Sequence, residues 1–126
     1  MSRVQPSQLT RSGPFFEHFN DQRRVDAVEE LMRVAEEGGL SLTHMAIAFV
    51  LAHPGVTAAI TDPRTLEQLE DLLAGAEVTL TDDLLDRIDA VVPPGADIGR
   101  HQMIDSPPTL TTPALRRRPT VSRAVG

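Results

Sequence analysis

The fold is decided by residues 54–73, PGVTAAITDPRTLEQLEDLL. The apolar run at residues 56–60 is short and lies between Pro-Gly and Asp-Pro, which predicts a strand. Thr65 and Gln68 then match a capping box that opens an amphipathic helix. The inner face of this helix is predicted to consist of Leu66, Leu69, Leu72 and Leu73. A strand, a tight turn and a helix start leave free backbone N–H groups and the positive end of the helix dipole at the turn. With Arg64 beside it, this turn is typical of a phosphate-binding site.

The rest of the chain predicts helices that would cover such a strand. Residues 21–37 place apolar side chains at three- and four-residue spacing, as on one face of a helix. Ser41 caps a second helix at residues 42–52, which is apolar on nearly all sides. Thr81 caps a last helix with Leu84, Leu85, Ile88 and Val91 turned inward. The sequence therefore predicts a mostly helical chain, with about four helices and one clear strand.

Composition divides the chain into three parts. Residues 1–20 are polar apart from an aromatic cluster at Phe15, Phe16 and Phe19, and predict an irregular segment. Residues 21–95 hold the helices and the strand. Residues 96–126 combine prolines, Ser/Thr residues and the run Arg116-Arg117-Arg118, which predicts a flexible, disordered tail with solvated arginines.

The missing residue types exclude several chemistries. The 126 residues contain no Cys, Trp or Tyr, and all 12 positive residues are Arg. A Lys Schiff base, a Tyr acid, a Cys nucleophile and thiolate metal sites are therefore excluded, and we find no metal-ligand spacing. The net charge of −6 argues against nucleic-acid binding. No apolar run approaches the ~20 residues that a membrane span needs, so we expect a cytoplasmic protein without a membrane partner.

Two stretches carry a family resemblance. Residues 39–60, GLSLTHMAIAFVLAHPGVTAAI, and residues 63–71, PRTLEQLED, resemble the aldo/keto reductase family, as does the later run LTDD…RID before VPPG. The resemblance implies an α/β fold, the (β/α)8 TIM barrel. What matches is only its C-terminal fragment: the seventh helix, the eighth strand, the eighth helix and the C-terminal extension.

The resemblance also implies a function. The family reduces aldehydes and ketones with NADPH, using an Asp/Tyr/Lys/His tetrad from the first half of the barrel. This chain lacks those positions and has no Tyr or Lys at all, so we expect no catalytic residues and no catalysis by the chain alone. An NADP(H) contact is still implied: Arg64 for the phosphate, the Thr65 N–H at the helix start, Gln68 for the nucleotide, and Asp71 where the family usually has Glu.

Two residues depart from the family pattern at this turn. Asp62 stands where the family commonly has Gly, and brings a negative charge toward the phosphate. Leu72 replaces a common Asn that would meet the adenine. Thr65 and Gln68 are also explained by capping alone.

The fragment character leaves two hypotheses about partners. In the first, another chain supplies the missing part of the barrel. In the second, the chain is a non-catalytic helical module that self-associates or binds a partner through its apolar faces. Both predict exposed apolar surface, because the strand and the second helix lack their barrel neighbours.

Overall fold

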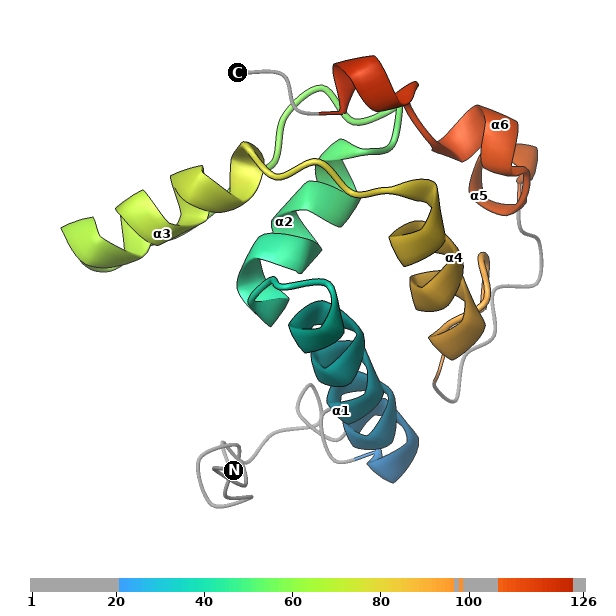
Figure 1. Cartoon of the computed structure of the whole chain (residues 1–126), viewed down its shortest axis with the longest axis horizontal. Coiled ribbons are helices and arrows are strands. Elements are labelled where there is room, and N and C mark those ends of the chain that lie inside the picture. Colours follow the sequence, from blue (N-terminus) through green and yellow to red (C-terminus); the bar gives the residue numbers. More distant parts are fainter. Residues whose placement is uncertain (1–20, 97, 99–106, 124–126) are drawn as a thin grey trace.

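The computed structural model describes residues 21–96, 98 and 107–123, and its regular structure in these residues is helical (Figure 1). The four main helices are α1 (Gln22–Glu37), α2 (Leu42–Leu51), α3 (Leu66–Ala76) and α4 (Asp82–Val91). Two single-turn helices, α5 (Pro108–Thr111) and α6 (Pro113–Arg116), and a 3₁₀ turn, η3 (Thr120–Ser122), follow. The predicted irregular segment at residues 1–20 lies outside the described residues.

Each main helix begins at a side-chain cap. The oxygens of Asp21, Ser41, Thr65 and Thr81 each accept a backbone N–H from the first turn of their helix. These bonds satisfy donors that have no partner inside the helix. At Asp21, the Arg23 side chain also donates to the carboxylate, and this hydrogen bond lowers the pKa of Asp21 to about 2. The four predicted helix starts are confirmed.

The buried core lies where α1, α2 and α4 meet. Its members are Val34, Ala35, Met45, Ala48, Leu80, Leu84, Leu85 and Ile88. Leu80 and Leu85 are the largest fully buried side chains of the described part of the chain. Every α4 residue in this core was predicted from the spacing of its apolar positions. The core is small and contains no aromatic ring, so its stability depends on a few aliphatic side chains.

A tight turn sets the angle between α1 and α2. Gly39 has a φ of +72°, which side chains with a Cβ rarely adopt. The Leu40 N–H donates to the Ala35 carbonyl, which closes the end of α1. The two helices meet at 92°. No single described helix is long and apolar enough to cross a membrane, and only this bent pair, counted together, meets the length and composition required.

The predicted strand at residues 56–60 is wrong. The structure has no strand among its described residues, and residues 56–63 run as an irregular connection from α2 to α3. The Ile60 side chain is 101% exposed. A parallel strand needs neighbouring strands to receive its backbone hydrogen bonds, and the described part of the chain offers none. An apolar sequence alone therefore does not make a strand here.

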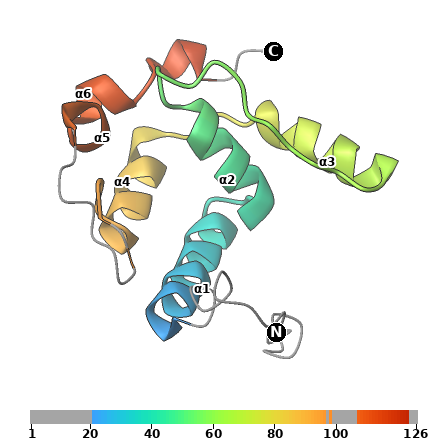
Figure 2. The ribbon, with the colours of Figure 1, turned by 180° about the vertical axis from the view of Figure 1, so that it is seen from behind.

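α3 also departs from expectation. Its leucines were predicted to form an inner face, yet Leu66 is 70% exposed, Leu73 58% and Leu69 37%. The helix contacts α2 near its own C-terminal end, where a Cβ on Gly75 would come within 3.2 Å of the His44 Cα atom. From there α3 extends away from the core, as both views show (Figures 1 and 2). Leu66 and Leu73 on its apolar face are therefore largely uncovered in the described structure, whereas Leu72 is half-buried.

The expected disordered tail is wrong for residues 107–123, which we call the C-terminal strap. Arg118 connects the strap to the end of α2. Its backbone N–H donates to the Ala52 carbonyl at 2.7 Å, and its guanidinium donates to the carbonyls of Leu51 and Val56. The last carbonyls of a helix have no partner inside the helix. Arg118 supplies those donors, which is a physical reason for the strap to dock there.

The other strap arginines are buried and paired rather than solvated. Arg123 is 6% exposed and donates to the Leu80 carbonyl at 2.8 Å and to Asp82 at 2.7 Å. Arg116, 9% exposed, is ion-paired to Asp89 on α4. Guanidinium groups present several donors in a fixed fork, so each one bridges more than one acceptor. The arginine run thus fastens the strap to α2 and α4.

The buried Leu85 side chain should contribute strongly to stability. Replacing Leu85 with Ala removes a fully buried side chain and leaves a cavity, so we expect the free energy of unfolding to fall by about 2–5 kcal/mol. The matched control is Leu73→Ala on the exposed face of α3, expected to change it by less than about 0.5 kcal/mol. Urea titration followed by circular dichroism measures both. Equal losses in the two variants would contradict the placement of the core.

Candidate functional site

The turn that leads into α3 is built by local hydrogen bonds. The Gln68 N–H donates to the Thr65 hydroxyl at 3.2 Å, and the Gln68 side-chain oxygen accepts the Arg64 N–H at 2.9 Å. The return bond of a capping box usually goes to the cap residue itself. Here it goes one residue earlier. The turn therefore holds its shape although no strand precedes it.

This turn presents donors to an incoming anion. The N–H groups of Leu66 and Glu67 have no acceptor among the described residues. They point out of the N-terminus of α3, where the helix dipole favours negative charge. The exposed Arg64 guanidinium likewise has no partner within the described part of the chain. Three of the four predicted nucleotide contacts, Arg64, Thr65 and Gln68, are thus brought together at one helix start.

The negative net charge of the turn opposes the binding of an anion there. Residues 62–71 contain one cation, Arg64, against four carboxylates on Asp62, Glu67, Glu70 and Asp71. All five side chains are exposed, so solvent and salt screen their interactions. The turn therefore has the donors of a phosphate site without a net positive charge.

The fourth predicted contact, Asp71, is engaged by another residue. Its carboxylate oxygen Oδ1 lies 2.7 Å from Nε2 of His44 on α2. Asp71 therefore links α3 to α2 and lies one turn beyond the anion-facing donors. Sequence reasoning missed this pair, because the two residues are 27 positions apart and no local pattern connects them.

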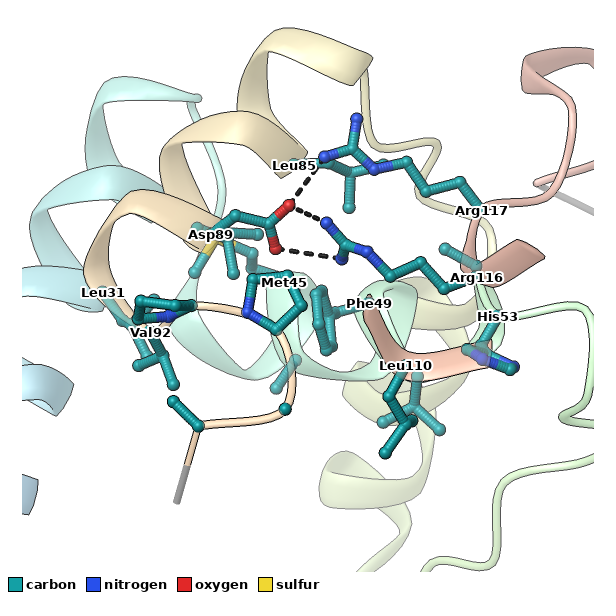
Figure 3. Close-up of a pocket in the computed structure, with 18 of the residues that line it drawn as sticks. Leu31, Met45, Phe49, His53, Leu85, Asp89, Val92, Leu110, Arg116 and Arg117 are labelled. Atoms are coloured by element: carbon teal, nitrogen blue, oxygen red, sulfur yellow. Dashed lines mark hydrogen bonds and ion pairs between the residues drawn. The ribbon is translucent and has the colours of Figure 1, made fainter. Parts of the chain in front are cut away.

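The structure also contains a cleft that the sequence did not predict. It encloses about 480 Å³ between α1, α2, α4, the residues after α4 and the C-terminal strap (Figure 3). Most of its lining is apolar, with Met45, Phe49 and Leu110 among the side chains that face it. None of the predicted nucleotide contacts lies in its wall. The cleft and the turn are separate features.

One end of the cleft carries a charged cluster of Asp89, Arg116 and Arg117. Arg116 donates to both oxygens of Asp89, and Arg117 donates to Asp89 at 2.7 Å (Figure 3). Arg117 also donates to Asp86 at 2.7 Å. Burial acts to lower the pKa of Arg117, but its hydrogen bonds to Asp86 and Asp89 outweigh burial and raise that pKa. Arg117 therefore stays charged although its side chain is largely shielded from water.

Known proteins are similar to the part of the chain that contains the four main helices and the turn before α3. Residues 3–93 match the aldo/keto reductase family. An uncharacterized oxidoreductase of Bacillus subtilis (strain 168), YrpG, is 35% identical over 71 residues, which cover 56% of this chain and 22% of that protein. The chain thus spans about a fifth of the length of this curated relative.

The capping arrangement makes a prediction about α3. Gln68→Ala removes the acceptor of the Arg64 N–H, so we expect a loss of about 0.5–1.5 kcal/mol in the stability of α3. Gln68→Glu keeps an acceptor at the same place and should remain within about 0.5 kcal/mol of the wild type. Native-state hydrogen exchange of the α3 amides measures both. If Gln68→Glu destabilises α3 as much as Gln68→Ala does, the hydrogen bond from the Arg64 N–H to the residue 68 side chain does not stabilise the helix.

Proposed function

Because the chain belongs to the aldo/keto reductase family, we propose that it is the C-terminal, NADP(H)-contacting part of a reductase that acts on aldehydes or ketones. The observation that supports this most is the turn before α3, which combines free N–H groups, an unpaired guanidinium and the matching family residues. The chain itself contributes no catalytic residue, since it has no Tyr or Lys for the tetrad. Its role would be to hold the cofactor.

The proposed contact uses the residues as they lie. The 2′-phosphate of the adenosine would lie at the N-terminus of α3, where the Leu66 and Glu67 N–H groups and the Arg64 guanidinium donate to its oxygens. The Gln68 oxygen is already used by Arg64, while its NH₂ group has no acceptor in the described structure and would face the nucleotide. Asp71 would have to leave His44 to take part. The nicotinamide chemistry would fall to residues outside this chain.

Catalysis would then need the other barrel strands and the tetrad. We propose that another chain supplies the first seven strands and the tetrad, and that residues 56–60 pair with it as the eighth strand. Ile60, Leu66 and Leu73 are exposed apolar side chains on the segment that such a partner would cover. Pairing would also give the backbone of residues 57–61 the hydrogen bonds that it lacks here.

A second candidate is a non-catalytic module that associates through its helices. The observation that favours it is the stripe of Leu66, Leu69 and Leu73 on α3, at a spacing that faces one side of the helix. An exposed stripe of this kind marks an interaction surface. This candidate needs no nucleotide, so nucleotide binding separates the two.

Isothermal titration of the chain with NADPH tests the first proposal. We expect binding at sub-millimolar NADPH, and at least about tenfold weaker binding by Arg64→Ala, since a charge-assisted contact to phosphate contributes about 1.5–3 kcal/mol. NADH lacks the 2′-phosphate and should bind wild type and variant alike. The control is Arg33→Ala, which loses only an exposed pair with Glu30 on α1. Absence of heat at sub-millimolar NADPH, or an equal effect of both variants, would overturn the retained cofactor site.

A further inference from the structure

We propose that the cleft between α1, α2, α4 and the C-terminal strap binds an apolar monocarboxylate. Its hydrocarbon body would fill the cleft, and its carboxylate would lie against Arg116 and Arg117. This inference does not rest on the nucleotide contact, because the cleft shares no residue with the turn before α3.

The size and lining of the cleft suit a small hydrocarbon body. Its volume of about 480 Å³ falls within the ~300–1,000 Å³ of small-molecule sites. The walls come from Met45 and Phe49 on α2, Ile88 on α4 and Leu110 on the strap. Phe49 and its neighbour Val50 remain 40% and 43% exposed, so apolar surface is available to a ligand. Covering such surface is favourable at about 25 cal/mol per Å².

His53 contributes shape rather than charge to the cleft. Its Nδ1 accepts the Gly55 N–H at 2.9 Å, which requires an unprotonated nitrogen there. Its Nε2 lies 2.9 Å from the Thr109 carbonyl and donates to it. The ring is therefore a neutral tautomer with both nitrogens satisfied. The charge that a ligand would meet comes from the cluster at the other wall.

That cluster carries a buried excess of positive charge. The side chains of Arg116 and Arg117 are 8% and 11% exposed, and both bind the same carboxylate, Asp89, itself 16% exposed. The further partners of Arg117, Asp86 and Asp82, are 71% and 63% exposed, so solvent screens their charges. Two shielded cations thus face one shielded anion. A ligand carboxylate would supply the missing negative charge at the end of an apolar cleft.

Unused donors point to the same chemistry. The Nε atoms of Arg116 and Arg117 are both buried and have no hydrogen-bond partner in the described structure. A buried donor without an acceptor is unfavourable, and more so on a charged group. The carboxylates of the described residues reach the terminal nitrogens of the two guanidinium groups but not their Nε atoms. A carboxylate carries two acceptor oxygens and no donor, and small rotations of the arginine side chains would bring the Nε–H groups to it.

The test uses the full chain with decanoate and with decanol, which has the same chain length but no charge. Isothermal titration should show decanoate binding at least about tenfold more tightly than decanol. Methyl resonances of Met45 and Leu110 should shift on binding. Ala46→Trp fills the cleft from an exposed position on its wall, so it should weaken decanoate binding at least about tenfold.

The matched control is Ala90→Trp, the same substitution at an exposed α4 position outside the cleft. It should bind decanoate like the wild type. A charge variant, Arg117→Gln, should bring decanoate close to decanol in affinity, with decanol unchanged. Circular dichroism melts verify that each variant folds.

Three outcomes would overturn the proposal. Equal affinity for decanoate and decanol would show that the arginines do not bind the carboxylate. Undiminished decanoate binding by Ala46→Trp would place the ligand elsewhere. A change in oligomeric state on sedimentation of Ala46→Trp, without decanoate binding by the wild type, would identify the cleft as a contact between chains.

Discussion

The structure depends on where the backbone of residues 51–61 finds hydrogen-bond partners. The carbonyls of Leu51, Ala52 and Val56 receive donors from Arg118, which lies more than 60 positions later in the chain. Beyond Val56 no such donor arrives, and residues 57–61 run on as an open connection. One arginine thus marks the boundary between the packed helical unit and the exposed connection. Before that boundary the chain packs in α1 and α2. After it the connection and α3 extend from the core, and the chain returns to the core at Leu80.

This boundary has a consequence for the proposed function. The turn before α3 is held by Thr65 and Gln68, which are close in sequence, so it forms without the sheet. A strand needs partners far away in the chain or in another chain, so it does not form here. The free N–H groups at the start of α3 are therefore present in the described structure although no strand precedes them. Arg118 would also have to share or release the Val56 carbonyl if residues 56–60 joined a sheet.

The same distinction between local and distant interactions explains what sequence reasoning achieved. The caps at Ser41, Thr65 and Thr81 and the α4 residues of the core were predictable, because they depend on neighbours three or four positions apart. The family was recognisable from residues 39–71. The strand was predicted from a pattern that presumes neighbouring strands. The strap was missed because a short arginine run in a proline-containing segment is typical of solvated tails, and nothing local reveals its partners on α2 and α4. The His44–Asp71 pair and the cleft were missed for the same reason.

Amide hydrogen exchange of residues 57–61 tests the central claim most directly. The account predicts that these amides exchange about as fast as those of an unstructured peptide, while amides in the middle of α2 and α4 exchange only on global unfolding. Slow exchange at residues 57–61, comparable to that of α2, would contradict the account, because it would show that this segment already pairs as a strand.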